Sequence, residues 1–158
     1  MRLTAFSDYA LRVLMYAATA GDRLVTIEET ARVYSISRAH LMKVVNILIR
    51  AGYLRGVRGR SGGFTLARPP AQINLGELVR ATEPDFALVE CFIAEDRCLV
   101  SGCCKLPAVL SEALDSFVAT LDRYTLADIT LTRRDFDLAV PPGTESGKKA
   151  SSPSSRRA

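Results

Sequence analysis

The chain has 158 residues, of which 48% are hydrophobic and 24% are charged, and its formal net charge at pH 7 is +4. This composition is typical of a globular protein with one main core, and no apolar run approaches the ~20 residues that a membrane-spanning helix needs. The first residues contain no apolar segment typical of a signal peptide. We therefore expect a cytoplasmic protein that does not bind a membrane.

The charges are unevenly distributed along the chain. Between Glu29 and Glu77 there is no acidic residue, but this stretch contains Arg32, Arg38, Lys43, Arg50, Arg55, Arg58, Arg60 and Arg68. Between Thr82 and Asp128 acidic residues outnumber basic ones. A basic run is often only a solvated surface, so its placement on the predicted elements decides whether it indicates a polyanion partner.

Two helices are predicted in the first 34 residues. Apolar residues at helical spacing over 6–20, followed by Gly21, predict the first helix. Thr26 and Glu29 fit a capping box, in which the threonine hydroxyl and the glutamate carboxylate each accept a hydrogen bond from the other residue's backbone N–H group. This pair predicts a second helix that ends near Tyr34.

A third helix and a hairpin follow. Ser37 fits the N-cap of a helix that ends at 51–52, with an apolar face formed by Leu41, Val44, Val45 and Leu48. Two short helices joined by a tight turn indicate a helix-turn-helix motif. The extended runs 53–57 and 63–66 flank a glycine-rich turn, which predicts the wing. The predicted fold is therefore mainly α with a small β-hairpin, in a winged helix-turn-helix arrangement.

The C-terminal half contains two further predicted helices. The first runs from Leu75 to Thr82 and the second, amphipathic helix runs from Pro107 to about Tyr124. The wide apolar stripe of the second helix predicts a homodimer, because a twofold contact with another copy would cover that stripe. Thr125 starts a short final turn. Residues 141–158 contain no large apolar side chain and are predicted to be disordered.

The basic residues coincide with the elements that read DNA in a winged helix. With the third helix in the major groove of double-stranded DNA, its exposed side chains would reach base edges or phosphates, namely those of Arg38, Ala39, His40, Met42, Lys43 and Arg50. Arg58 and Arg60 at the wing tip would suit a narrow minor groove. The single histidine, His40, is alternatively a metal ligand, but it lies among cationic residues and far in sequence from the cysteines.

All four cysteines lie between residues 91 and 104. The spacing of Cys91, Cys98, Cys103 and Cys104 does not match the paired knuckles of structural zinc sites. Irregular loop spacing suits an iron–sulfur cluster better, because its ligands surround a larger group. Zinc and unliganded structural cysteines remain as alternatives. An enzyme is disfavoured because the sequence shows no Ser/His/Asp constellation and no phosphate-binding loop, and a redox or cluster-carrier protein would not need a wing.

Four segments resemble the iron–sulfur winged-helix transcriptional repressors, a superfamily that includes IscR, iron-responsive regulators and the nitric-oxide-sensing NsrR. These segments are 1–12, 35–43, 57–63 and 98–106, and the resemblance covers residues 1 to about 130. It implies three regions: a winged helix-turn-helix DNA-binding domain over 1–83, a cluster-binding loop and dimerisation helix over 84–140, and the tail over 141–158.

The resemblance also implies a set of cluster ligands. Cys91, Cys98 and Cys104 fit the family register, because five residues separate the last two and a Lys-Leu pair follows; Cys103 is an extra thiol that leaves the choice between 103 and 104 open. Pro107 stands where IscR-type proteins have a histidine ligand. Asp8 matches the aspartate that NsrR-type proteins take from the partner subunit.

The implied activity is that of a homodimeric repressor with a [4Fe–4S] cluster, favoured over [2Fe–2S], that leaves operator DNA when the cluster is nitrosylated. The alternative within the superfamily is a sensor of iron or of iron–sulfur status.

Overall fold

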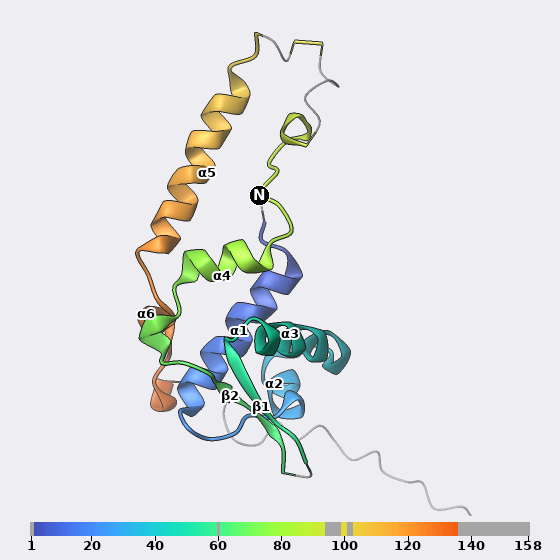
Figure 1. The fold of residues 1–158 in the computed structure, drawn as a ribbon, viewed down its shortest axis with the longest axis vertical. Helices are drawn as coiled ribbons and strands as arrows, with labels where there is room; N and C mark the ends of the chain where they lie inside the picture. Colours follow the sequence, from blue (N-terminus) through green and yellow to red (C-terminus); the bar gives the residue numbers. More distant parts are fainter. Residues whose placement is uncertain (1, 60, 94–98, 101–102, 136–158) are drawn as a thin grey trace, which may run out of the picture.

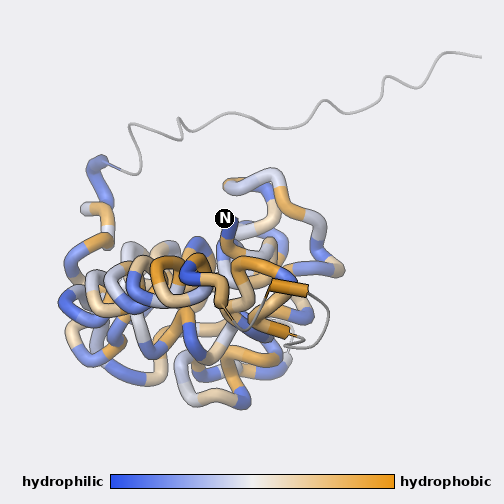
Figure 2. Tube along the Cα trace, turned by 90° about the horizontal axis from the view of Figure 1, so that it is seen from above, coloured by the Kyte–Doolittle hydropathy of each residue, from blue (hydrophilic) through white to orange (hydrophobic). Residues whose placement is uncertain are grey.

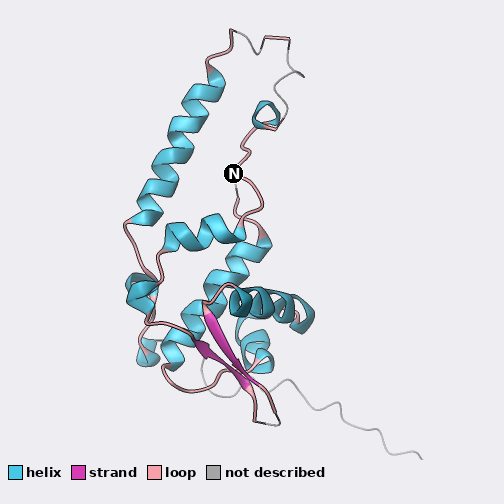
Figure 3. Cartoon of the chain, viewed as in Figure 1, coloured by secondary structure: helices cyan, strands magenta, loops and turns pink. Residues whose placement is uncertain are grey.

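The computed structural model describes residues 2–59, 61–93, 99–100 and 103–135. The described part contains helices and one two-stranded antiparallel sheet, as predicted (Figures 1 and 3). In chain order the elements are α1 (Ala5–Ala20), α2 (Ile27–Tyr34), α3 (Arg38–Arg50), β1 (Leu54–Val57), β2 (Gly63–Leu66), α4 (Leu75–Thr82), α5 (Leu106–Asp122) and α6 (Leu126–Ile129), with short 3₁₀ turns at Pro70–Gln72 and Glu90–Phe92.

The first three helices and the hairpin share one core. The predicted inner face of α3 is buried: Leu41 and Leu48 are fully enclosed, and Val44 and Val45 nearly so. Hydrophobic and hydrophilic residues alternate along the helices, the pattern expected when each helix buries one side (Figure 2). Burial of these apolar faces is the main force that holds α3 against α1 and the sheet.

The hairpin is a wing anchored at its base. Its strands pair with Leu54 opposite Leu66 and Val57 opposite Gly63. The backbone of Val25, just before α2, extends the sheet: the N–H of Val25 donates to the carbonyl of Phe64 at 2.9 Å, and the N–H of Phe64 donates back at 2.8 Å. Phe64 is fully buried, so the wing is tied to the core by both its backbone and its largest side chain.

The N-caps predicted at Thr26 and Ser37 are present in the structure, and one predicted contact is missing. The hydroxyl of Ser37 accepts a hydrogen bond from the N–H of His40 at 3.3 Å, and that of Thr26 accepts one from Glu29 at 3.1 Å. The predicted capping box at Thr26 is only half correct. The carboxylate of Glu29 accepts hydrogen bonds from Tyr16 and Arg23 instead, because these stronger donors lie beside it.

Helix α5 extends away from the core as an arm, and its first residues lie at the end opposite to the wing (Figure 1). The helix ends at Asp122, close to the predicted end. None of its residues is buried within the single chain, and Val109 on its predicted apolar stripe is 61% exposed. The arm therefore has a partly apolar surface that its own chain does not cover.

The base of the arm is fixed to α4. The carboxylate of Asp122 accepts hydrogen bonds from both terminal nitrogens of Arg80, at 2.6 and 3.2 Å, and its carbonyl accepts one from Asn74 at 2.7 Å. After the arm, Leu126 of α6 is fully buried and its N–H donates to the carbonyl of Ile73 at 2.8 Å. These contacts hold the C-terminal end of α5 in place.

The described residues form no helix long and apolar enough to cross a bilayer. The predicted tail over 141–158 lies outside the described residues.

Gly76→Ala should destabilise the protein, because Gly76 of α4 packs directly against Asp122 at the end of α5. An added methyl group would overlap the Asp122 carboxylate and lie 3.0 Å from the backbone nitrogen of Asp122. We expect a loss of about 1–3 kcal/mol in the free energy of unfolding, measured by denaturant titration. A gain of about 1 kcal/mol, as for glycine to alanine on an open helix face, would contradict the close approach. Adding Asp122→Ala should recover part of the loss.

Candidate nucleic-acid interface and cysteine loop

The predicted DNA-reading side chains of α3 share its exposed side. Their residues, which are Arg38, Ala39, His40, Met42, Lys43 and Arg50, are all exposed, while the apolar residues between them form the core. The same amphipathic pattern that buries α3 on one side therefore places these side chains on the other. Arg58 is exposed at the wing turn, and Arg60 lies outside the described residues.

A groove of about 660 Å³ separates the start of α2 and helix α3 from the wing. Its lining includes Glu28, Arg38, Asn46, Ile49 and Arg58. Sequence reasoning missed Glu28 and Asn46: Asn46 is uncharged, and Glu28 precedes the basic block. Asn46 lies eight positions after Arg38, so helical periodicity could have placed it on the same exposed face.

Arg38 is not a free cation. One of its terminal nitrogens lies 2.8 Å from a carboxylate oxygen of Glu28, and both side chains are about two-thirds exposed, at 67% and 65%. An ion pair this exposed contributes little to folding. In the structure it places the Arg38 guanidinium beside Glu28 at the edge of the groove.

His40 lies at the junction of α3 with α1. Its ring centroid is 6.2 Å from that of Tyr9, and both residues line a hollow of about 140 Å³ together with Phe6 and Lys43. Within the described residues His40 belongs to no group of metal-ligating side chains. The metal alternative for this histidine therefore gains no support.

Arg68 differs from the other basic residues between Glu29 and Glu77. Its guanidinium carbon lies 4.6 Å from the centroid of the Tyr53 ring, in a cation–π contact, and its Nε is buried without a hydrogen-bond partner. This arginine packs against the Tyr53 ring and is partly buried, whereas Arg58 is exposed. The sequence alone shows no difference between it and its neighbours.

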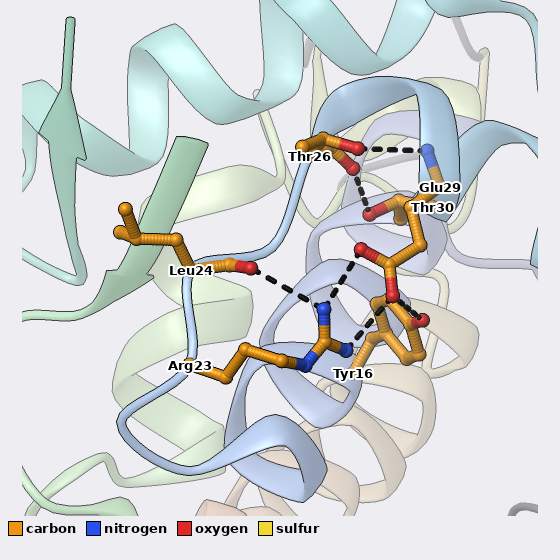
Figure 4. Close-up of polar contacts among 6 residues, drawn as sticks. All are labelled: Tyr16, Arg23, Leu24, Thr26, Glu29 and Thr30. Atoms are coloured by element: carbon orange, nitrogen blue, oxygen red, sulfur yellow. Dashed lines mark hydrogen bonds and ion pairs between the residues drawn. The ribbon is translucent and has the colours of Figure 1, made fainter. Parts of the chain in front are cut away.

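A polar cluster links α1 to the first turn of α2 (Figure 4). The hydroxyl of Tyr16 donates to Glu29 at 2.5 Å, and Arg23 donates two hydrogen bonds to the same carboxylate at 2.8 and 3.0 Å. Burial, followed by the hydrogen bond to Glu29, raises the pKa of Tyr16 to about 12. Burial alone would raise the pKa of Glu29, but the hydrogen bonds from Arg23 and Tyr16 outweigh it and lower that pKa. The cluster holds the helix-turn-helix motif against α1.

Two of the three described cysteines directly precede the arm. Cys91 is half-buried in the 3₁₀ turn Glu90–Phe92, a short element within the predicted loop, and Cys103 and Cys104 are exposed just before α5. The N–H groups of Cys103 and Cys104 both donate to the carbonyl of Val100, at 3.1 and 2.9 Å. All three thiols are free, and Cys98 lies outside the described residues.

Asp8 lies in the first turn of α1 and is paired within its own helix. Its carboxylate accepts a hydrogen bond from Nε of Arg12 at 2.9 Å, which raises the pKa of Arg12. The Asp8 side chain is 43% exposed and therefore accessible from outside. Among the described residues, no group of three or more His, Cys, Asp or Glu side chains is close enough to hold a metal. The described part of a single chain thus does not bring Asp8 together with the cysteines.

Comparisons with known proteins agree with this architecture. The HTH-type transcriptional regulator NsrR of Bacillus licheniformis is 47% identical over 135 residues, which is 84% of this chain and 94% of the relative. Among solved structures, a transcriptional regulator from Listeria innocua matches with a TM-score of 0.66 and 23% identity, covering 94% of this chain and 93% of that one. IscR from T. potens matches with a TM-score of 0.65 and 24% identity, covering 89% and 91%.

At these identities the two structures show the fold alone, whereas the relative from Bacillus and a family model show the family. The model of Rrf2, described as an iron-dependent transcriptional regulator, matches residues 3–132, which span the winged helix, the cysteine segment and the arm. The chain therefore belongs to the Rrf2 family of transcriptional regulators and is not an enzyme.

Proposed function

We propose that this protein is a cytoplasmic, homodimeric repressor that senses nitric oxide through a [4Fe–4S] cluster and leaves operator DNA when the cluster is nitrosylated. Each cluster would be held by Cys91, Cys98 and Cys104 of one subunit and by Asp8 of the other. The observation that carries this proposal is the set of free thiols at Cys91, Cys103 and Cys104, the last two directly before the arm, in a chain 47% identical to a regulator named NsrR.

The donor set fits an iron–sulfur cluster. Cys91 and Cys104 have free thiols, which as thiolates are the usual ligands of such clusters, and Cys98 would supply the third. The Asp8 carboxylate is a harder ligand than a thiolate and binds iron more weakly in a sulfur-rich set. A bound cluster would supply iron that reacts with nitric oxide. Because Asp8 does not join the cysteines within the described part of one chain, a partner subunit is a natural source for it.

The arm supports the proposed dimer. Leu106 and Val109 are 53% and 61% exposed, and Leu110, Leu114 and Phe117 are only half-buried. Packing α5 against its copy would cover this apolar surface and remove it from water. Residues 84–140 would then form the loop and dimerisation region, and residues 1–83 the DNA-binding region.

The DNA contacts follow from the exposed side of α3 and the wing. Arg38, Ala39, His40, Met42 and Lys43 would face base edges in the major groove, with Arg50 toward the backbone. Arg58, and Arg60 beside it, would follow the neighbouring minor groove or its phosphates. Two such heads in a dimer would read a palindromic operator.

Asp8 would connect the signal to the DNA. When Asp8 does not bind iron, Arg12 is available as its partner at 2.9 Å. Asp8 lies on the helix that carries the Tyr16 cluster with Glu29, and this helix also contacts α3. Exchange of its carboxylate between iron and Arg12 would therefore shift the population of DNA-competent orientations of the head.

A second candidate is a sensor of iron or of iron–sulfur status. The description of the matching family as iron-dependent favours it. It shares the DNA-binding surface and the cysteine ligands with the first candidate and differs in the signal. Titration of the anaerobic protein with nitric oxide, following absorbance and DNA binding together, separates the two.

Arg58→Gln should weaken binding to all DNA sequences, because an exposed arginine at the wing would contact the backbone or the minor groove. The slope of log K against log salt should become shallower by about one unit, as expected for one lost phosphate contact. Fluorescence anisotropy at several salt concentrations measures both. Arg123→Gln, an equal charge change at the end of α5, is the control and should have little effect. Equal effects from the two variants would contradict the wing assignment.

Cys91→Ser, Cys98→Ser and Cys104→Ser should each lose stable cluster binding, whereas Cys103→Ser should keep it. Each of the first three changes removes one of only three proposed thiolates. Iron and sulfide analysis of anaerobically purified protein gives the result. If Cys103→Ser loses the cluster and Cys104→Ser keeps it, the third ligand is Cys103.

Asp8→Ala should leave a more labile cluster, because three thiolates remain and one iron lacks its protein ligand. Absorbance spectra and the rate of reaction with nitric oxide should both change. Arg12→Gln is the matched control, because it also breaks the ion pair but keeps the carboxylate. If Asp8 were only a helix carboxylate, both variants would cost at most about 0.5 kcal/mol of stability and leave the spectrum unaltered.

A further inference from the structure

The groove beside α3 contains a negative charge on a surface that is otherwise suited to DNA. Glu28 is the only acidic residue among the described residues that line it, and its carboxylate lies 2.8 Å from Arg38. Arg58 on the wing lines the same groove. DNA lying against α3 and the wing would bring its phosphates close to this carboxylate.

The backbone at Glu28 is held in place by the contacts of its neighbours. It follows Ile27 in the first turn of α2, whose N-cap Thr26 accepts a hydrogen bond from Glu29 at 3.1 Å. Glu29 in turn binds Tyr16 and Arg23, so this turn is tied to α1 (Figure 4). The two adjacent acids therefore have different surroundings: Glu29 faces α1, and Glu28 lies at the groove.

We infer that Glu28 is a specificity-determining residue. Its carboxylate orients the Arg38 guanidinium toward a base edge and so prevents it from binding the phosphates of non-operator DNA. This inference rests on the proposed position of Arg38 in the major groove.

The chemistry of the pair supports this role. A guanidinium presents five N–H donors in a rigid fork, so a carboxylate can accept from one edge while another edge faces a base. Recognition of a guanine by arginine requires the guanidinium to lie in line with the base edge, whereas a phosphate accepts hydrogen bonds from many directions. Releasing Arg38 from Glu28 would therefore favour phosphate contacts over base contacts. The negative charge of Glu28 also repels DNA phosphates directly, and added salt screens this repulsion.

Glu28→Gln tests the inference in the full-length, anaerobically purified protein. The specific probe is a duplex that the unmodified protein enriches from a random-sequence pool, and the non-specific probe is the same duplex scrambled. We expect binding to the scrambled duplex to tighten roughly two- to fivefold, the range expected for an exposed ion pair. Its salt slope should steepen by about one unit as Arg38 reaches a phosphate. Affinity for the enriched duplex should stay the same or fall, so discrimination decreases.

Three further variants separate this role from other effects. Glu77→Gln removes the same charge from the exposed first turn of α4, outside the groove, and should leave discrimination unchanged. Glu28→Asp keeps the carboxylate and should retain at least part of the discrimination. In an Arg38→Gln background, Glu28→Gln should have no further effect on discrimination, because the residue it acts through is gone. Thermal melting of each variant shows that the fold is retained.

Specific outcomes would overturn the inference. One is that Glu28→Gln tightens binding to both duplexes by the same factor. Another is that it changes the affinity for neither duplex. In both cases the unmodified protein still prefers its enriched duplex, so the proposed function survives. If Arg38→Gln keeps full discrimination, Arg38 is not a base contact and the inference fails with that assignment. If the unmodified protein enriches no sequence, the proposed function fails and this inference with it.

Discussion

The burial of helix α1 is the constraint on which the rest of the structure depends. Ala10, Val13, Leu14 and Ala17 have no exposed surface, and α1 contacts α2, α3, β2, α4 and α6. Two of these four residues are alanines, whose small side chains let neighbouring elements approach closely. Helix α3, which we propose reads DNA, the wing and the base of the arm are therefore all positioned relative to one central helix.

Helix α1 makes polar contacts with different elements at its two ends. Its first turn contains Asp8 and is tied to the end of α4: the hydroxyl of buried Ser7 donates to that of Thr82 at 2.8 Å, and the N–H of Thr4 donates to Glu83 at 2.9 Å. Further along, Tyr16 joins the carboxylate of Glu29 in α2. A change at Asp8 would therefore be connected to the helix-turn-helix motif through one continuous helix and its hydrogen bonds. This physical continuity is what the proposed switch requires.

The proposed DNA surface is a balance of charges and not simply a basic patch. Arg38 is neutralised in part by Glu28, Arg68 packs on Tyr53, and Arg58 remains exposed at the wing. A fully basic surface would bind any duplex through its phosphates, whereas a regulator needs a difference in affinity between operator and other DNA. The pairing of Glu28 with Arg38, if Arg38 reads a base as proposed, is one way to create that difference.

The sequence by itself determined the order and type of the elements, because hydrophobic period, caps and glycine positions are local signals. The helices over 5–20, 38–50 and 75–82, the wing and the buried face of α3 all lie where these signals predicted them. Only the tertiary structure decided which side chains meet. In the folded chain the Glu29 carboxylate accepts hydrogen bonds from Tyr16 and Arg23. Glu28 forms an ion pair with Arg38, and the Arg68 guanidinium packs on the Tyr53 ring. Such contacts join separate elements, and their partners depend on how helices and strands pack, which local patterns do not encode.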